Sequence, residues 1–137
     1  DERSAERVPG GIYGPCASAR TYDQLWQAAR VALQAGWSVI VDATFLRRPE
    51  RDRFHALALE LGAPFALLDC QAGEAVLRER VAARAQRGDD ASEADLAVLA
   101  AQRELDDPIA DDETPYTLAL HTDRPWDAAA LAARWTG

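Results

Sequence analysis

The sequence predicts an α/β protein in which helices cover both faces of a parallel sheet. Helical segments alternate with short apolar runs at 39–41 and 65–68, and a last strand is predicted at 116–121. Continuous apolar runs are typical of strands that are buried on both faces, and their alternation with helices is typical of a parallel sheet. At 137 residues, the chain is expected to form one domain, 1–137.

The first helix is predicted from Thr21 to the glycine at position 36. Thr21 and Gln24 form a Thr-x-x-Gln capping box, and Gly36 stands at the usual position after a helix end. Residues 1–20 contain several glycines and prolines without an apolar period and are predicted to form an entry loop. One helical face is apolar, namely Tyr22, Leu25, Trp26, Ala29 and Leu33.

The middle of the chain continues the alternation. Residues 39–41 are β-branched and are predicted to form a strand buried on both faces. The second helix is predicted between Pro49 and Gly62, because proline suits a first helical position and glycine follows helix ends. A strand at 65–69 and a third helix at 74–87 follow.

The last third of the chain supplies two more helices and one strand. Ser92 is predicted to cap a fourth helix at 93–105. The acidic segment 106–113 is predicted to be a loop, and 116–121 the last strand. Pro125 is predicted to open a final helix that ends near Trp135.

Composition limits the classes of partner. The formal net charge of −8 argues against a general surface for nucleic acid or anionic membrane. No apolar run approaches the roughly 20 residues that a membrane-spanning helix needs. Two cysteines are too few for a disulfide framework, and no signal peptide is evident, so a cytoplasmic location is expected.

All fifteen basic residues are arginine, so the chain contains no lysine. A phosphate-binding loop of the G-x-x-x-x-G-K-[ST] type needs its lysine. The chain also contains no methionine, which a translation start would supply. We therefore expect this sequence to be part of a longer protein.

Asp42 is the first candidate for a functional residue. It directly follows the apolar run 39–41, and ligands of open α/β sheets bind at the carboxyl ends of strands. An apolar strand followed by aspartate is typical of phosphate-transferring enzymes that hold Mg²⁺, or water on Mg²⁺, beside a nucleotide. The alternative is that Asp42 only starts a turn.

A stripe of arginines is the second candidate. Arg80, Arg84 and Arg87 recur at helical spacing and share one face of the predicted third helix. Three like charges repel one another unless anions lie opposite, and the guanidinium fork matches phosphate oxygens. The alternative is pairing with Glu74, Glu79 or the acidic turn that follows.

Other groups carry weaker signals. A second arginine cluster follows Asp42 and comprises Arg47, Arg48, Arg51 and Arg53. It lies at a predicted helix start, where positive charge interacts unfavourably with the helix dipole. Either an anionic partner or simple solvation would explain it. Two histidines and two distant cysteines give no metal-ligand spacing. The four tryptophans, at 26, 37, 126 and 135, are predicted to pack in the core and at its edge.

Taken together, the motifs resemble the P-loop kinase-like ATP-binding domain of the AAA type. They are the stretches G-W-S-V-I-V-D-A-T-F-L-R-R-P-E-R-D-R-F, L-L-D-C, R-V-A-A-R and G-D-D-A-S-E-A-D-L-A-V-L. The resemblance runs from about residue 11 to residue 113. This domain is related to gluconate kinase, polynucleotide kinase and zeta-toxin kinases, and it is often fused to an aminoglycoside-phosphotransferase-like domain.

The resemblance implies a three-layer P-loop NTPase-like parallel sheet that lacks its first βα unit here. It implies that Asp42 is catalytic and holds Mg²⁺ through water, with Thr44, Arg48 and Arg51 on the substrate side. It also implies that Arg80, Arg84 and Arg87 bind the ATP phosphates, and that 88–95 is a lid-like turn containing Asp90 and Ser92.

The function implied is that of a small-molecule kinase with ATP and Mg²⁺ as cofactors. It would transfer the γ-phosphoryl group to a hydroxyl acceptor, with upstream residues or a fused phosphotransferase-like domain as partners. The alternatives are a non-catalytic interaction module with a degenerate kinase fold, and a nucleotide hydrolase.

The family's usual strand order has a further consequence. Its first strand lies between the third and fourth, so the strands at 39–41 and 65–68 would lose a neighbour here. Strands with unpaired edges recruit partners, and we therefore expect self-association through an open sheet edge.

Overall fold

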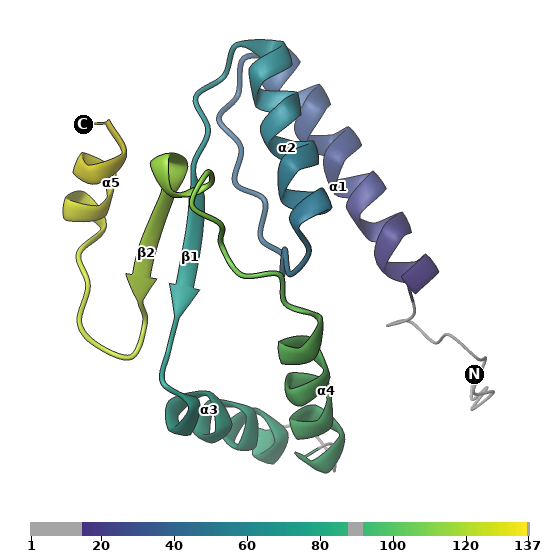
Figure 1. Ribbon diagram of the computed structural model, residues 1–137, viewed down its shortest axis with the longest axis vertical. Helices are drawn as coiled ribbons and strands as arrows, with labels where there is room; N and C mark the ends of the chain where they lie inside the picture. Colours follow the sequence, from purple (N-terminus) through teal and green to yellow (C-terminus); the bar gives the residue numbers. More distant parts are fainter. Residues whose placement is uncertain (1–14, 88–91, 137) are drawn as a thin grey trace. The chain divides into compact units, whose positions relative to one another are not determined.

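The computed structural model describes residues 15–87 and 92–136 (Figure 1). These residues form two compact units: unit 1 holds the chain up to Thr44 together with Glu50–Ala63, and unit 2 holds Phe45–Pro49 and the chain from Pro64 onward. No helix within the described ranges is long and apolar enough to cross a membrane. The elements are α1 (Pro15–Gln34), α2 (Arg48–Leu61), β1 (Leu67–Gln71), α3 (Glu74–Arg87), α4 (Ser92–Leu105), the 3₁₀ helix η1 (Thr114–Tyr116), β2 (Thr117–His121) and α5 (Ala128–Thr136).

Glycines end α1 and α2, as the sequence predicts. Gly36 has φ +87° and Gly62 has φ +66°, a left-handed conformation that side chains with a Cβ adopt at a cost. After α1, the N–H of Trp37 donates to the carbonyl of Ala32 at 3.0 Å. After α2, the N–H of Ala63 donates to the carbonyl of Ala58 at 2.9 Å. Each bond satisfies a carbonyl that the last helical turn leaves without an N–H partner.

Long polar side chains connect α1 with α2 in unit 1. Arg30 donates two hydrogen bonds to Glu60, at 2.9 and 3.0 Å. Arg53 donates one hydrogen bond to Asp23 and forms an ion pair with it across the same two helices. Both guanidinium groups lie over the ring of Trp26, at 5.3 Å for Arg30 and 5.0 Å for Arg53. The indole thus combines apolar packing with two cation–π contacts.

The apolar core of unit 1 lies on the inner faces of these helices. Its buried side chains are Ala29 of α1 and Phe54, Leu57 and Ala58 of α2. Phe54, Leu57 and Ala58 follow helical spacing, which is why one face of α2 is buried and the other exposed.

Unit 2 contains a two-stranded parallel sheet. Strands β1 and β2 lie side by side, with Asp69 paired to Ala119 (Figure 1). The N–H of Thr122 extends the ladder by donating to the carbonyl of Gln71 at 2.8 Å. Because strand carbonyls alternate between the two edges, the carbonyl of Ala119 points away from β1. Arg134 of α5 donates to it at 3.2 Å and so covers that edge.

The helices of unit 2 are tied together near the start of α3. Helix α3 packs against α4, and Glu74 of α3 pairs with Arg103 of α4 at 3.2 Å. Glu74 also accepts a hydrogen bond from Arg78 one turn later. These two arginines hold the pKa of Glu74 below its ordinary value, chiefly through their hydrogen bonds. The predicted bounds of α3 are confirmed in full.

The predicted strand at 39–41 is wrong. Residues 37–42 are not part of any sheet, and Ile40 is 96% exposed instead of buried. The described residues therefore contain two strands where the sequence predicts three. An apolar run becomes a strand only when a neighbour supplies hydrogen-bond partners, and none of the described segments does so here.

Several predicted boundaries also need correction. Helix α1 begins at Pro15, six residues before the predicted cap at Thr21, so part of the predicted entry loop is helical. Strand β1 begins at Leu67 rather than at 65, and α5 begins at Ala128 rather than at Pro125. The side chain of Asp127 accepts a hydrogen bond from the N–H of Ala129, which explains the later start of α5. The 3₁₀ helix η1 is not anticipated by the sequence.

Three tryptophans predicted to lie in the core or at its edge are exposed. Trp37 is 72% exposed, and Trp126 and Trp135 are also more than half exposed. The indole N–H of Trp26, by contrast, is buried. The apolar helical period of α1 predicts that Trp26 lies on the inner face of that helix. The other three tryptophans belong to no such apolar period, so the sequence does not predict their exposure.

The pairing of Arg30 with Glu60 leads to a pH-dependent prediction. The hydrogen bonds from Arg30 hold the pKa of Glu60 below its ordinary value. A depressed folded-state pKa gives stabilisation that is complete above the unfolded pKa, about 4.3, and is lost as pH falls through the folded value. We therefore expect Glu60→Gln to destabilise the protein at neutral pH, and this difference to shrink below about pH 4.

Urea unfolding at neutral and acidic pH measures this effect. Glu79→Gln is the matched control, because Glu79 is exposed on α3 and forms no ion pair with any described residue. The prediction would be contradicted if both variants lost the same free energy of unfolding at neutral pH, or if the loss in Glu60→Gln persisted at acidic pH.

Candidate functional site

Asp42 lies in unit 1, in the segment 38–43 between α1 and α2. The segment 38–43 has no helical or strand structure, and its residues form no hydrogen bond or ion pair with any other described residue. The carboxylate of Asp42 is exposed. It is therefore open to a ligand from solution, which is what a role in holding hydrated Mg²⁺ requires.

Thr44 lies two residues further along in the same unit. Its hydroxyl is 3.1 Å from the hydroxyl of Tyr22 on α1, and either group can donate. This side-chain contact connects α1 with a residue two positions after Asp42. The next residue, Phe45, has φ +44°, a conformation that is uncommon for a bulky side chain and marks a sharp change of chain direction.

The arginine stripe lies on α3 in unit 2, and its three members have different surroundings. Arg80 donates to the hydroxyl of Thr122 at 2.9 Å and to its carbonyl at 2.7 Å. The side chain of Arg87 donates to the carbonyl of Ala83 at 3.3 Å. Arg84 is exposed and forms no ion pair with a residue in the described ranges. Within the stripe, Arg80 is therefore anchored on Thr122, Arg87 folds back on its own helix, and Arg84 is open to solvent.

Arg80 helps to shape the turn that leaves the carboxyl end of β2. The turn is also held by Asp123, whose carboxylate accepts a hydrogen bond from the N–H of Gly73 at 2.9 Å. This bond holds the pKa of Asp123 below its ordinary value. Since Gly73 follows β1 and precedes α3, the two contacts join the carboxyl ends of both strands to α3. Ligands of parallel sheets bind at such ends.

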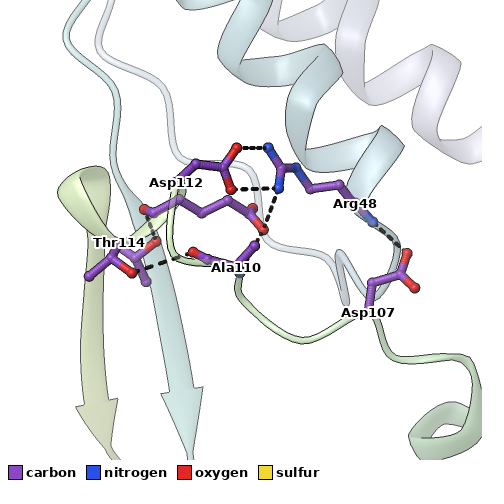
Figure 2. A network of polar contacts seen from close by, with 7 residues as sticks. Arg48, Asp107, Ala110, Asp112 and Thr114 are labelled. Atoms are coloured by element: carbon purple, nitrogen blue, oxygen red, sulfur yellow. Dashed lines mark hydrogen bonds and ion pairs between the residues drawn. The ribbon is translucent and has the colours of Figure 1, made fainter.

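Arg48 belongs to a network that the sequence does not predict (Figure 2). Its guanidinium forms two hydrogen bonds with Asp112, at 2.9 and 2.7 Å, and lies 3.5 Å from Glu113. Its backbone N–H, in the first turn of α2, donates to the carboxylate of Asp107 at 2.9 Å. An acidic group at this position satisfies an N–H that the helix leaves unpaired. The hydrogen bond from Arg48 also lowers the pKa of Asp112.

Glu113 is the buried centre of this network. It is 0% exposed, and its carboxylate accepts a hydrogen bond from the N–H of Ala110 at 3.2 Å. The backbone carbonyl of Glu113 accepts from the hydroxyl of Thr117 at 2.7 Å, at the start of β2. The acidic segment predicted to be a plain loop therefore anchors the first turn of α2. Asp107 and Asp112 are 59 and 64 residues away from Arg48 in the sequence, so residue spacing does not predict that they bind it.

The remaining predicted site residues are placed as follows. Arg51 is only 4% exposed, which is a poor position for contact with a substrate. Asp90 and the first half of the predicted lid, 88–91, lie outside the described residues, and Ser92 is the first residue of α4. Asp42, Thr44 and Arg51 belong to unit 1, whereas Arg48 and the arginine stripe belong to unit 2. Their predicted roles in binding and catalysis remain predictions.

No group of three or more potential metal ligands occurs among the residues described here. Of the predicted site residues whose side chains are described, Asp42 is the open carboxylate and Arg84 is the open guanidinium of the stripe. One carboxylate is sufficient where Mg²⁺ keeps most of its water and takes other ligands from phosphates.

Comparison with known proteins identifies the family. A family model described as an AAA domain matches residues 2–108, which is more than half of the chain. No curated protein matches the sequence, and no solved structure does. The parallel pairing of β1 and β2, with helices between them in the chain, is consistent with the α/β fold of that family. The chain therefore belongs to the AAA domain family, whose members have a P-loop NTPase-like fold and bind nucleotides.

Proposed function

We propose that this chain is part of an ATP-dependent small-molecule kinase, which transfers the γ-phosphoryl group of Mg-ATP to a hydroxyl acceptor. The observation that carries the proposal is the exposed carboxylate of Asp42, which directly follows an apolar segment in a chain of this family. Phosphoryl transfer needs little covalent chemistry from the protein. It depends on positioning and on neutralising charge, and both tasks suit a few well-placed side chains.

Asp42 fits a role in holding Mg²⁺. Its carboxylate forms no hydrogen bond or ion pair with any of the described residues, so none of these has to be displaced. When bound, the metal ion would neutralise charge on the phosphate oxygens. The chain's own contribution is to hold the carboxylate in place, which the Tyr22–Thr44 contact supports from two residues away.

The arginine stripe supplies the positive charge in this proposal. Arg84 is exposed on α3 without an acidic partner in the described ranges, so it can bind a phosphate at no loss of an existing ion pair. Arg80 holds the turn after β2 and so positions the carboxyl end of that strand. Because the chain has no lysine, the proposal requires that residues outside this sequence supply the lysine of a phosphate-binding loop.

Two other functions remain open, and one experiment separates all three. The complete protein is titrated with ATP in the presence and absence of Mg²⁺, and the release of γ-phosphate is followed with and without hydroxyl compounds. A kinase binds Mg-ATP and transfers phosphate to an acceptor. A hydrolase releases phosphate at the same rate without one. A protein that binds no nucleotide is an interaction module, and this result would overturn the proposal.

Arg84→Ala is expected to weaken nucleotide binding by about 1.5–3 kcal/mol, the range for hydrogen bonds to charged groups. The reason is that alanine removes a guanidinium that the proposal assigns to a phosphate. Calorimetric titration of the complete protein with ATP measures the change. Arg78→Ala is the control on the same helix, because Arg78 pairs with Glu74 and is not assigned to phosphate. Equal affinities for the wild type and Arg84→Ala would refute the assignment.

A further inference from the structure

Thr122, the first residue after β2, connects three elements of unit 2. Its N–H donates to the carbonyl of Gln71 at the end of β1 at 2.8 Å, and its hydroxyl donates to the same carbonyl at 3.3 Å. The hydroxyl oxygen also accepts from one terminal nitrogen of Arg80 at 2.9 Å, and the Thr122 carbonyl accepts from the other at 2.7 Å. A hydroxyl group can donate once and accept twice, so these bonds are compatible. The ends of β1 and β2 and the middle of α3 thus meet at one residue.

A second contact attaches α3 to the same turn near the start of the helix. The carboxylate of Asp123 accepts from the N–H of Gly73, the residue before α3, at 2.9 Å. Gly73 and Arg80 are separated in the chain by about two helical turns, which corresponds to roughly 10 Å along a helix axis. A helix that is held at one point can pivot there, whereas two points separated along the axis fix its direction. We call the pairs Gly73–Asp123 and Arg80–Thr122 the α3 clamp.

Arg84 extends from the part of α3 that follows the clamp. It lies one turn beyond Arg80, is exposed, and forms no ion pair with a described residue. Residues four apart share one face of a helix, so the contact that fixes Arg80 also fixes the face that carries Arg84. We propose that Arg80 is a positioning residue rather than a phosphate ligand, because its bonds to Thr122 hold α3 where Arg84 can bind a phosphate. This inference rests on the proposed function, in which Arg84 has that role.

The existing bonds of Arg80 favour positioning over direct binding. Both of its terminal nitrogens donate to Thr122, and hydrogen bonds from a charged donor are roughly twice as strong as neutral ones. A phosphate that accepted from both of these nitrogens would have to replace those bonds, and the Thr122 carbonyl would lose its charged donor. Arg84 has no such bonds to a described residue, so it binds a phosphate without this loss.

Replacement of Thr122 by valine separates the two roles by the direction of its effect. Valine is close to threonine in shape but cannot accept a hydrogen bond from Arg80. If Arg80 positions α3, Thr122→Val weakens the binding of Mg-ATP to the complete protein by about threefold or more, because one of the two bonds is lost. If Arg80 binds phosphate itself, the loss of a competing acceptor leaves binding unchanged or tightens it. Calorimetric titration measures the affinity.

Two variants control for the loss of a hydroxyl group as such. Thr117→Val removes a hydroxyl at the other end of β2, where it donates to the carbonyl of Glu113 at 2.7 Å. This variant should bind Mg-ATP like the wild type. Thr122→Ser keeps the hydroxyl at the clamp and should also bind like the wild type. Circular dichroism verifies that the variants are folded, as expected because neither threonine is fully buried.

A double-mutant cycle tests whether Arg80 acts through Arg84. In the wild-type background, Arg84→Ala is expected to weaken Mg-ATP binding by about tenfold or more. In Arg80→Ala, the helix no longer holds Arg84 in place, so the same substitution should weaken binding by only about threefold or less. Independent phosphate ligands would give equal losses in both backgrounds. Inorganic triphosphate, which has no nucleoside, should show the same pattern as ATP.

The outcomes distinguish this inference from the proposed function. If the wild type binds Mg-ATP and Thr122→Val binds it equally well or more tightly, the inference is overturned and the proposed function stands. Equal losses for Arg84→Ala in both backgrounds have the same meaning. A loss in Thr122→Val that appears with Mg-ATP but not with triphosphate also overturns the inference, because the turn would then act on the nucleoside. A wild type that binds neither compound overturns both.

Discussion

Replacement of Glu113 by alanine is expected to lower the free energy of unfolding by about 3 kcal/mol, one of the two largest effects predicted for this chain. Glu113 is fully buried, and its carboxylate accepts the N–H of Ala110 and lies beside the guanidinium of Arg48. Alanine would leave the N–H without an acceptor, the guanidinium with less compensating charge, and a cavity where the side chain packs. Urea unfolding at neutral pH measures the loss.

Asp112→Asn is the matched control for this experiment. Asp112 binds the same guanidinium, but its side chain is 68% exposed, and exposed ion pairs contribute little. We expect a much smaller effect than for Glu113→Ala. Glu113→Gln should fall between the two, because the amide oxygen can still accept from Ala110 while the charge is lost. Equal effects of the Asp112 and Glu113 substitutions would show that burial does not determine the strength of this network.

Asp42→Asn is expected to slow the loss of γ-phosphate from ATP by a hundredfold or more in the complete protein, which is roughly 3 kcal/mol of activation free energy. An amide keeps the shape of the side chain but lacks the charge that attracts a hydrated divalent cation. Because Asp42 is exposed and forms no ion pair with a described residue, the substitution should leave the unfolding free energy nearly unchanged. Rates at saturating Mg²⁺ are the measurement.

Asp106→Asn supplies the comparison for Asp42. Asp106 is an exposed carboxylate that directly follows α4, and it is not assigned to the nucleotide. Its substitution should leave the rate unchanged. Near-normal turnover in Asp42→Asn would make Asp42 a residue of the turn alone, which is the alternative that the sequence leaves open.

The parts of the fold that depend on local signals could be predicted from the sequence. Gly36 and Gly62 end their helices because the chain needs a left-handed residue there, and this requirement is visible in the residue type. Helix α3 was predictable to the residue because its apolar period and its first acidic residue, Glu74, lie within one segment. Helix starts were harder to predict, since Pro15 and Thr21 are both suitable first residues.

The parts that depend on distant partners could not be predicted. The run 39–41 has the composition of a buried strand, but composition does not reveal whether a neighbouring strand exists. In the sequence, Arg48 cannot be distinguished from the other arginines of its cluster. Only the fold shows that Asp107, Asp112 and Glu113 contact it. The candidate site is limited in the same way. Residue type and spacing indicate Asp42 and Arg84, but they do not reveal that Arg80 is anchored on Thr122.

The indole of Trp26, which the guanidinium groups of both Arg30 and Arg53 contact, has a spectroscopic consequence. Its N–H is buried, whereas the other three tryptophans are more than half exposed. A small water-borne quencher such as iodide therefore reaches those three rings much more readily than Trp26. The emission that resists quenching comes from one ring, and its loss during unfolding would report when α1 separates from α2. The native chain thus carries its own fluorescent label for that one helix pair.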